Sequence, residues 1–245
     1  MDPLERIIWS ADVPDEAALM AHLGRMPELR IVKIDRLLAT EAGLGIVDRL
    51  NDRGVRVFDD AKIIEIPSKV VGIAGKHLAH RPWLLNCMAG VQSSGVLEDP
   101  DPNKVDGLKR FAQACHEAGT KPCGVTVLTS KRADVVRGEF NGRGAVEQVL
   151  YYVEALLESG FTDVVCSAQE LEAIRAESRF DGLALNVPGI RPRGSDVGDQ
   201  ARVDTPSTAL EAGADRLVIG RAITTGDPSE NLDRIVEEIA VLAAR

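Results

Sequence analysis

Residues 56–62 read RVFDDAK, a short run of β-branched and aromatic residues that ends in two aspartates and a lysine. A run of this length and composition is typical of a buried strand. The fixed charges stand at the point where burial of a charge becomes costly. The stretch therefore predicts a strand whose last residues serve a purpose other than packing.

The same kind of apolar run recurs along the chain, separated by longer amphipathic stretches. Between the runs, apolar residues recur at helical spacing, for example over 15–26, 40–54, 105–119, 146–160 and 230–245. Three glycines follow such helices, where a left-handed residue favours a helix end: Gly54, Gly119 and Gly160. The predicted strands are 7–12, 30–35, 56–62, 83–90, 122–129, 163–168, 182–190 and 216–221.

Eight strands alternating with eight helices over 245 residues fit an α/β fold of the (β/α)8, or TIM, barrel type. A doubly wound open sheet uses the same alternation and is the alternative. The first turn after a strand, SADVPDE at 10–16, contains no glycine and so lacks the dinucleotide-binding fingerprint. We therefore expect one barrel domain over residues 1–245.

The bulk properties exclude several classes of protein. A formal net charge of −9 disfavours a nucleic-acid-binding surface, which needs a basic face. No leader-like or membrane-spanning apolar segment is present, so we expect a cytoplasmic protein without membrane contact. Four cysteines without CxxC spacing are expected to be small buried residues rather than redox or metal ligands: Cys87, Cys115, Cys123 and Cys166.

Polar residues gather where the predicted strands end, which is the catalytic face of such a barrel. Asp15 and Thr40 are set apart, because both are expected to be helix N-caps. The remaining candidates for a site at that face are Asp12, Lys33, Asp60, Lys62, Thr129, Ser130, Arg191, Gly220 and Arg221.

The alternation of a strand sharpens the interpretation of 56–62. Phe58, Asp60 and Lys62 share one face, and Asp59 lies on the other, where it would meet solvent or a helix. A lysine beside a carboxylate stays protonated even when burial favours its neutral form. Such a lysine could protonate a carbon that becomes basic during a reaction, and a purely structural ion pair is the alternative.

A second polar cluster is VPGIRPRGSDVGDQARVDTP at 187–206, followed by LVIGRAIT at 217–224. Loops after the last two strands of such barrels commonly bind phosphate through backbone N–H groups. Arg193 and Arg202 are interpreted as surface charges. The predicted phosphate ligands are Arg191, Gln200, Gly220 and Arg221.

Seven segments, taken in order, resemble the orotidine 5′-phosphate decarboxylase family of the bacterial type. They are SADVPD, IVKID, FDDAKIIEIP, TVLTS, VVCSAQE, the 187–206 segment and LVIGRAIT. The resemblance runs from about residue 7 to residue 225. It implies a homodimeric barrel that removes CO2 from orotidine 5′-monophosphate to give UMP, without a metal or organic cofactor.

The resemblance also implies roles for individual residues. Asp60 would face the scissile carboxylate, Lys62 would stabilise and protonate the carbanion at C6, and Glu65 would reach the partner's site near the ribose. The ribose hydroxyls would be bound by Asp12 and Lys33, and the pyrimidine would lie near Thr129 and Ser130. The implied phosphate ligands are Arg191, Gln200, Gly220 and Arg221, and Ile66 is a further substrate-binding residue.

The chain departs from the family pattern at three places. Glu65 replaces the second aspartate of Asp-x-Lys-x-x-Asp, Lys69 replaces a threonine, and the end of the fourth strand, WLLNCMAG at 83–90, lacks the usual histidine. Two other functions are therefore kept open. One is a specialised paralogue acting on another carboxylated nucleotide or sugar phosphate, and the other is an inactive nucleotide-binding homologue.

Overall fold

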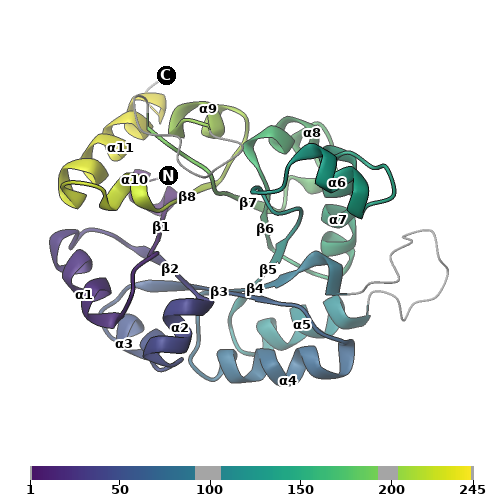
Figure 1. Cartoon of the computed structure of the whole chain (residues 1–245), viewed down its shortest axis with the longest axis horizontal. Coiled ribbons are helices and arrows are strands. Elements are labelled where there is room, and N and C mark those ends of the chain that lie inside the picture. The colour runs from purple at the N-terminus through teal and green to yellow at the C-terminus, as the bar shows by residue number, and fades with distance from the viewer. Residues whose placement is uncertain (1, 92–105, 193–203, 244–245) are drawn as a thin grey trace.

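A computed structural model describes residues 2–91, 106–192 and 204–243, and within these ranges eight parallel strands close into a barrel (Figure 1). The order around the barrel is the order in the sequence, and β1 pairs with both β2 and β8. This closure confirms the (β/α)8 barrel and excludes the open sheet. The strands, each overlapping a predicted one, are β1 (Ile7–Ser10), β2 (Ile31–Asp35), β3 (Arg56–Ile63), β4 (Leu84–Met88), β5 (Lys121–Val125), β6 (Asp163–Val165), β7 (Ala184–Val187) and β8 (Arg216–Ile219).

Helices surround the barrel, and three connections in the described ranges hold two helices where one was expected. These pairs are α2 with α3, α6 with α7, and α10 with α11. None of the described helices combines the length and apolar character needed to cross a lipid bilayer. The helices are α1 (Glu16–Arg25), α2 (Arg36–Ala42), α3 (Ile46–Asn51), α4 (Pro67–Leu78), α5 (Asp106–Glu117), α6 (Ala133–Glu139), α7 (Ala145–Glu158), α8 (Leu171–Arg175), α9 (Pro206–Glu211), α10 (Arg221–Thr224) and α11 (Pro228–Ala243).

The helix predicted over 40–54 is wrong in its extent. Gly43 follows α2 with φ 74°, which is outside the helical region, and a new helix begins at Ile46. Thr40 is not an N-cap, because it lies inside α2 and its hydroxyl donates to the Arg36 carbonyl at 2.7 Å. Asp35 caps α2 instead by accepting the Leu38 N–H.

Other predictions about helix ends are confirmed. Asp15 caps α1 by accepting the N–H of Ala18 at 2.8 Å. Gly54, Gly119 and Gly160 have φ values of 76°, 72° and 85°, the left-handed conformation expected after a helix. Glycine adopts this conformation without a steric cost, and this explains its position at these turns.

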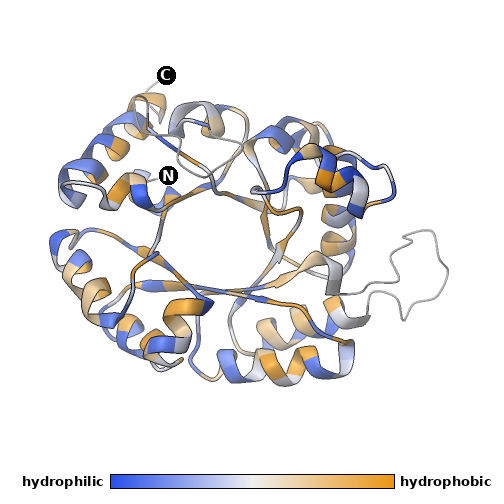
Figure 2. Cartoon of the chain, viewed as in Figure 1, coloured by the Kyte–Doolittle hydropathy of each residue, from blue (hydrophilic) through white to orange (hydrophobic). Residues whose placement is uncertain are grey.

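The core consists of two layers separated by the strands. Successive strand residues point alternately into the barrel and towards the helices, so Ile8 lies inside the barrel while Ile7 and Trp9 pack outside. Figure 2 shows polar and apolar residues sharing the larger outer helices, as expected where one side of a helix is covered. The inner layer is Ile8, Ile31, Phe58, Leu84, Cys123 and Val218.

All four cysteines are buried, as predicted, and none of them forms a disulfide. Burial raises the pKa of the Cys115 thiol to about 12 and raises those of Cys87, Cys123 and Cys166 as well. A thiol with a raised pKa is a poor nucleophile at neutral pH, because the reactive form is the thiolate. The cysteines therefore behave as small apolar side chains.

A cluster of cations around Trp83 lies at the end of the barrel where the strands begin. Arg56, Lys121 and Arg216 lie 5.0, 5.6 and 4.9 Å from its ring. Arg216 also pairs with Asp163, a fully buried carboxylate, at 2.7 Å. Because these residues stand at the first positions of their strands, they occupy the face that serves stability in such barrels.

We predict that Arg216→Met lowers the free energy of unfolding by about 3 kcal/mol, because Asp163 then stays buried without its cation. Urea denaturation measures this change. Arg132→Met removes the exposed pair with Asp134 and should leave the free energy of unfolding nearly unchanged, because solvent screens such a pair. Equal effects of the two substitutions would contradict the prediction.

Candidate active site

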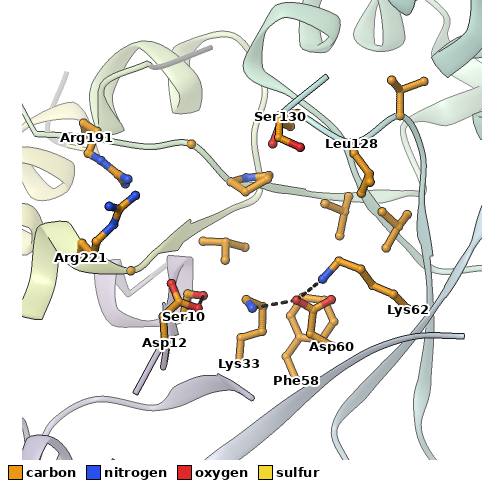
Figure 3. A pocket seen from close by; sticks show the side chains of 18 residues that line it. Ser10, Asp12, Lys33, Phe58, Asp60, Lys62, Leu128, Ser130, Arg191 and Arg221 are labelled. Carbon is orange, nitrogen blue, oxygen red and sulfur yellow. Dashed lines mark hydrogen bonds and ion pairs between the residues drawn. The ribbon is translucent and has the colours of Figure 1, made fainter. Parts of the chain in front are cut away.

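A cavity of about 580 Å³ opens at the carboxyl ends of the strands. Figure 3 shows its side chains converging from strands that are far apart in the sequence. Most of the sequence-predicted site residues line it, so the structure brings them together. The lining is Ser10, Asp12, Lys33, Phe58, Asp60, Lys62, Val125, Val127, Leu128, Thr129, Ser130, Val165, Pro188, Gly189, Arg191, Val218, Gly220 and Arg221.

Two lysines meet one carboxylate at the floor of the cavity. Asp60 Oδ2 accepts from Lys33 Nζ at 2.7 Å and lies 2.6 Å from Lys62 Nζ (Figure 3). The Asp60 and Lys33 side chains are only 6% and 11% exposed, whereas Lys62 is 38% exposed. Lys62 is therefore the more exposed of the two cations, although all three residues of the array line the cavity.

The array keeps its charges. Burial alone would raise the pKa of Asp60, but the ammonium groups of Lys33 and Lys62 outweigh it and lower that pKa to about 2. Burial would also lower the pKa of Lys33, yet the Asp60 carboxylate raises it above the ordinary value. At neutral pH Asp60 is thus an anion and Lys33 a cation.

The backbone at Lys62 departs from a regular strand. The pairing of β3 with β4 shifts register between Asp59 and Ile63, and Lys62 has φ 44°. This irregularity is of the β-bulge kind, which bends a strand and re-aims a side chain. The prediction that Lys62 and Asp60 point together is confirmed, but the bulge contributes to it as well as simple alternation.

Asn86 on β4 belongs to this network and was missed by the sequence analysis. Its Nδ2 donates to Asp60 Oδ1 at 2.6 Å, and its Oδ1 accepts the Lys62 N–H at 2.6 Å. The available signal was a lone amide inside the apolar run WLLNCM, since a buried polar group needs partners. Nothing in that run indicates which partners those are.

Asp59 points away from the cavity, as predicted. Its carboxylate is 1% exposed and lies 2.7 Å from Nδ1 of His77 on α4. The two neighbouring aspartates of β3 thus have separate surroundings, one facing the helices and one facing the cavity. Asp59 joins the strand to α4 and does not reach a bound molecule.

Two arginines stand at the opposite end of the cavity. Arg191 follows β7 and is largely buried, and its backbone N–H donates to the Asp204 carbonyl at 2.8 Å. Arg221 begins α10, and Figure 3 shows the two guanidinium groups directed towards each other. Paired guanidinium groups are suited to bind a phosphate or a carboxylate.

Gly220 and Asp12 meet between the two charged ends. A Cβ on Gly220 would lie 2.8 Å from Asp12 Oδ2, so the position accepts no larger residue without moving Asp12. Ser10 donates to Asp12 Oδ1 at 3.0 Å and holds the carboxylate from the other side. Asp12 is therefore fixed beside the cavity as a hydrogen-bond acceptor.

The other predicted residues divide into three groups. Thr129 and Ser130 line the cavity from the loop that follows β5. Glu65 and Ile66 lie between β3 and α4 and are not among the lining residues, and Glu65 accepts the Ile66 N–H at 3.1 Å. Gln200 lies outside the described residues.

The lowered pKa of Asp60 predicts a pH dependence of stability. Its ionised form stabilises the fold above the ordinary aspartate pKa, and this contribution is lost as the pH falls towards 2. The wild-type advantage over Asp60→Asn should therefore shrink by about 2 kcal/mol between about pH 5 and about pH 2. Urea denaturation across this range measures it, and a constant difference would contradict it.

Comparison with known proteins identifies the family of this chain. Residues 5–235 match the model of the "Orotidine 5'-phosphate decarboxylase / HUMPS family". A protein of Pseudomonas aeruginosa (strain LESB58) named orotidine 5′-phosphate decarboxylase is 37% identical, over 95% of this chain and 97% of that protein. One of Thermosynechococcus vestitus with the same name is 34% identical, over 96% and 95%.

The solved structures agree in fold. The crystal structure of orotidine 5′-phosphate decarboxylase from Lactobacillus acidophilus matches with a TM-score of 0.79 at 28% identity, covering 96% of this chain and 99% of that one. Both the family model and the relatives span nearly the whole barrel. The chain therefore belongs to the orotidine 5′-phosphate decarboxylase / HUMPS family.

Proposed function

We propose that this protein is a carboxy-lyase that converts orotidine 5′-monophosphate to UMP without a cofactor, in pyrimidine nucleotide biosynthesis. The observation that carries the proposal is the Lys33–Asp60–Lys62 array, which faces the same cavity as Arg191 and Arg221. A carboxylated nucleotide has an anionic group at one end and a phosphate at the other. The cavity offers charged residues at both ends to match it.

Asp60 acts on the bound substrate by repulsion. Its carboxylate stays ionised, since its pKa is about 2, and it would stand beside the substrate carboxylate. Like charges at close range are unfavourable, most of all in a site that excludes water. The repulsion disappears as the substrate carboxylate becomes neutral CO2, so Asp60 favours the reaction over the bound ground state.

Lys62 acts on the carbon. When the bond between C6 and the carboxylate breaks, the electron pair stays on C6 and CO2 leaves. The Lys62 ammonium lies beside the growing negative charge and stabilises it, which is the form of electrostatic catalysis that needs no reorganisation. Nζ then gives its proton to C6, and the neutral lysine regains a proton from solvent.

The rest of the cavity holds the substrate in place. Arg191 and Arg221 bind the phosphate, together with the backbone at Gly220, and Asp12 and Lys33 bind the ribose hydroxyls. The pyrimidine lies near Thr129 and Ser130. Binding energy from the remote phosphate can then pay for the repulsion at the carboxylate. The ring is enclosed by the apolar part of the lining: Phe58, Val125, Val127, Leu128, Val165, Pro188 and Val218.

We predict that the purified protein removes the orotate absorbance of orotidine 5′-monophosphate and that Lys62→Ala lowers kcat by at least about 1000-fold. UMP binding by Lys62→Ala should persist, because Arg191 and Arg221 remain. Lys76→Ala on α4 is the control and should leave kcat unchanged. A wild-type protein that binds UMP but leaves the substrate intact would favour the inactive homologue.

We propose a homodimer in which each subunit completes its partner's site. Ile64 and Ile66 flank Glu65 and are 61% and 57% exposed, although both are apolar. Leu37 of α2, at 71%, adds to the exposed apolar surface. Apolar exposure of this kind is typical of a surface that another subunit covers. Glu65 lies within it, outside its own cavity, and would reach the ribose in the partner.

We predict that Lys62→Ala and Glu65→Ala dimers are each poor enzymes and that a mixture recovers activity. After equal amounts re-associate, about one quarter of the wild-type activity should return, because half of the dimers are mixed and each has one intact site. The same mixture made with a covalently linked Lys62→Ala dimer is the control and should gain nothing. No recovery in the free mixture would show that Glu65 serves its own subunit.

The cellular setting is also part of the proposal. An enzyme of nucleotide biosynthesis would work in the cytoplasm as a free homodimer. The formal net charge of −9 supports a small nucleotide, bound in a local basic pocket, over nucleic acid as the partner.

A further inference from the structure

Asn86 is the buried group that joins the two functional residues of β3. It lies in the middle of β4 and is fully buried. It makes one bond to the Asp60 side chain and one to the Lys62 backbone, each 2.6 Å long. The cavity lining does not include it, so it acts behind the site.

The direction of the carboxamide follows from chemistry. The backbone N–H of Lys62 can only donate, so it must face the oxygen of the amide. The ionised carboxylate of Asp60 can only accept, so it must face the NH2 group. Among side chains of this size, the amide supplies both a donor and an acceptor, and exchanging its two ends would lose both bonds.

Each bond fixes one part of the array. The bond to Asp60 Oδ1 leaves Oδ2 for the two lysines and sets the plane of the carboxylate. The bond to the Lys62 N–H satisfies a donor at a residue with φ 44°, in the register shift between β3 and β4. A left-handed conformation in a residue other than glycine persists only where neighbours hold it.

We propose that Asn86 is a positioning residue, whose carboxamide aims the Asp60 carboxylate and the Lys62 backbone together and so sets where the Lys62 ammonium stands. Its effect on turnover rests on the proposed function, while its effect on geometry does not. Asn86 touches no substrate and is not a catalytic residue.

The first test separates positioning from stability. Asn86→Leu should lower kcat about 100-fold with KM within a few-fold of wild type, because a shift of about 1 Å at the reacting groups is costly while the phosphate end is untouched. The matched control is Asn186→Leu. Asn186 is a fully buried amide on β7 that donates to Asp163 at 3.2 Å, at the other end of the barrel. The Asn186→Leu variant should have a lower free energy of unfolding and an unchanged kcat.

The second test preserves side-chain volume and so covers the case where Asn86→Leu fails to fold. In Asn86→Asp, only the protonated acid can donate to Asp60, whereas the carboxylate repels it. The ratio of variant to wild-type kcat should therefore rise as the pH falls from about 9 to about 5. The ionisable groups linked to this position are Asp60 and Lys62, which bond to Asn86, Lys33, which pairs with Asp60, and Cys123, the register partner of Asn86 on β5.

Two outcomes would overturn the proposal in an active protein. One is a kcat for Asn86→Leu that matches that of Asn186→Leu, and the other is a ratio for Asn86→Asp that stays constant with pH. If the wild type does not turn over orotidine 5′-monophosphate, the proposed function fails. A crystal structure of Asn86→Leu then tests the positioning role by itself. Lys62 should leave the left-handed region or separate from Asp60, and an unchanged pair would overturn the proposal.

Discussion

The pairing of two ammonium groups with the single oxygen Asp60 Oδ2 is the interaction on which the site depends. A buried carboxylate is stable as an anion only where cations or donors compensate it. Lys33 compensates Asp60 from the buried side, so Lys62 can stand at the cavity without being the only partner. The array therefore keeps a negative and a positive charge ready at one point before any molecule binds.

The two ends of the barrel use charged residues for different purposes. At the amino ends of the strands, the cations gather on Trp83 and Asp163 and close the barrel. At the carboxyl ends, the charged groups line a cavity and leave space between them. The difference follows from the fold, since the loops after the strands are free to vary while the opposite face packs for stability.

Much of this protein could be predicted from the sequence alone. The alternation of short apolar runs with amphipathic stretches identifies the barrel, because strands and helices bury their apolar faces with different periods. Polar residues at strand ends identify most of the cavity, because parallel strands bring those ends to one face. The helix N-caps could not all be predicted in this way. Thr40 has a side chain suited to capping, but Asp35 caps α2 because it stands at the turn where that helix begins.

Only the tertiary structure decided how the site is supported. Asn86 lies 26 residues from Asp60 along the chain, and the pairing of β3 with β4 makes them neighbours. The register shift that turns Lys62 leaves no periodic mark in RVFDDAK, because it arises between strands and not within one. The sequence thus determined the barrel, its charged face and the family. The tertiary structure decided which buried amide holds the charges, because hydrogen bonds across strands depend on register and local sequence does not record it.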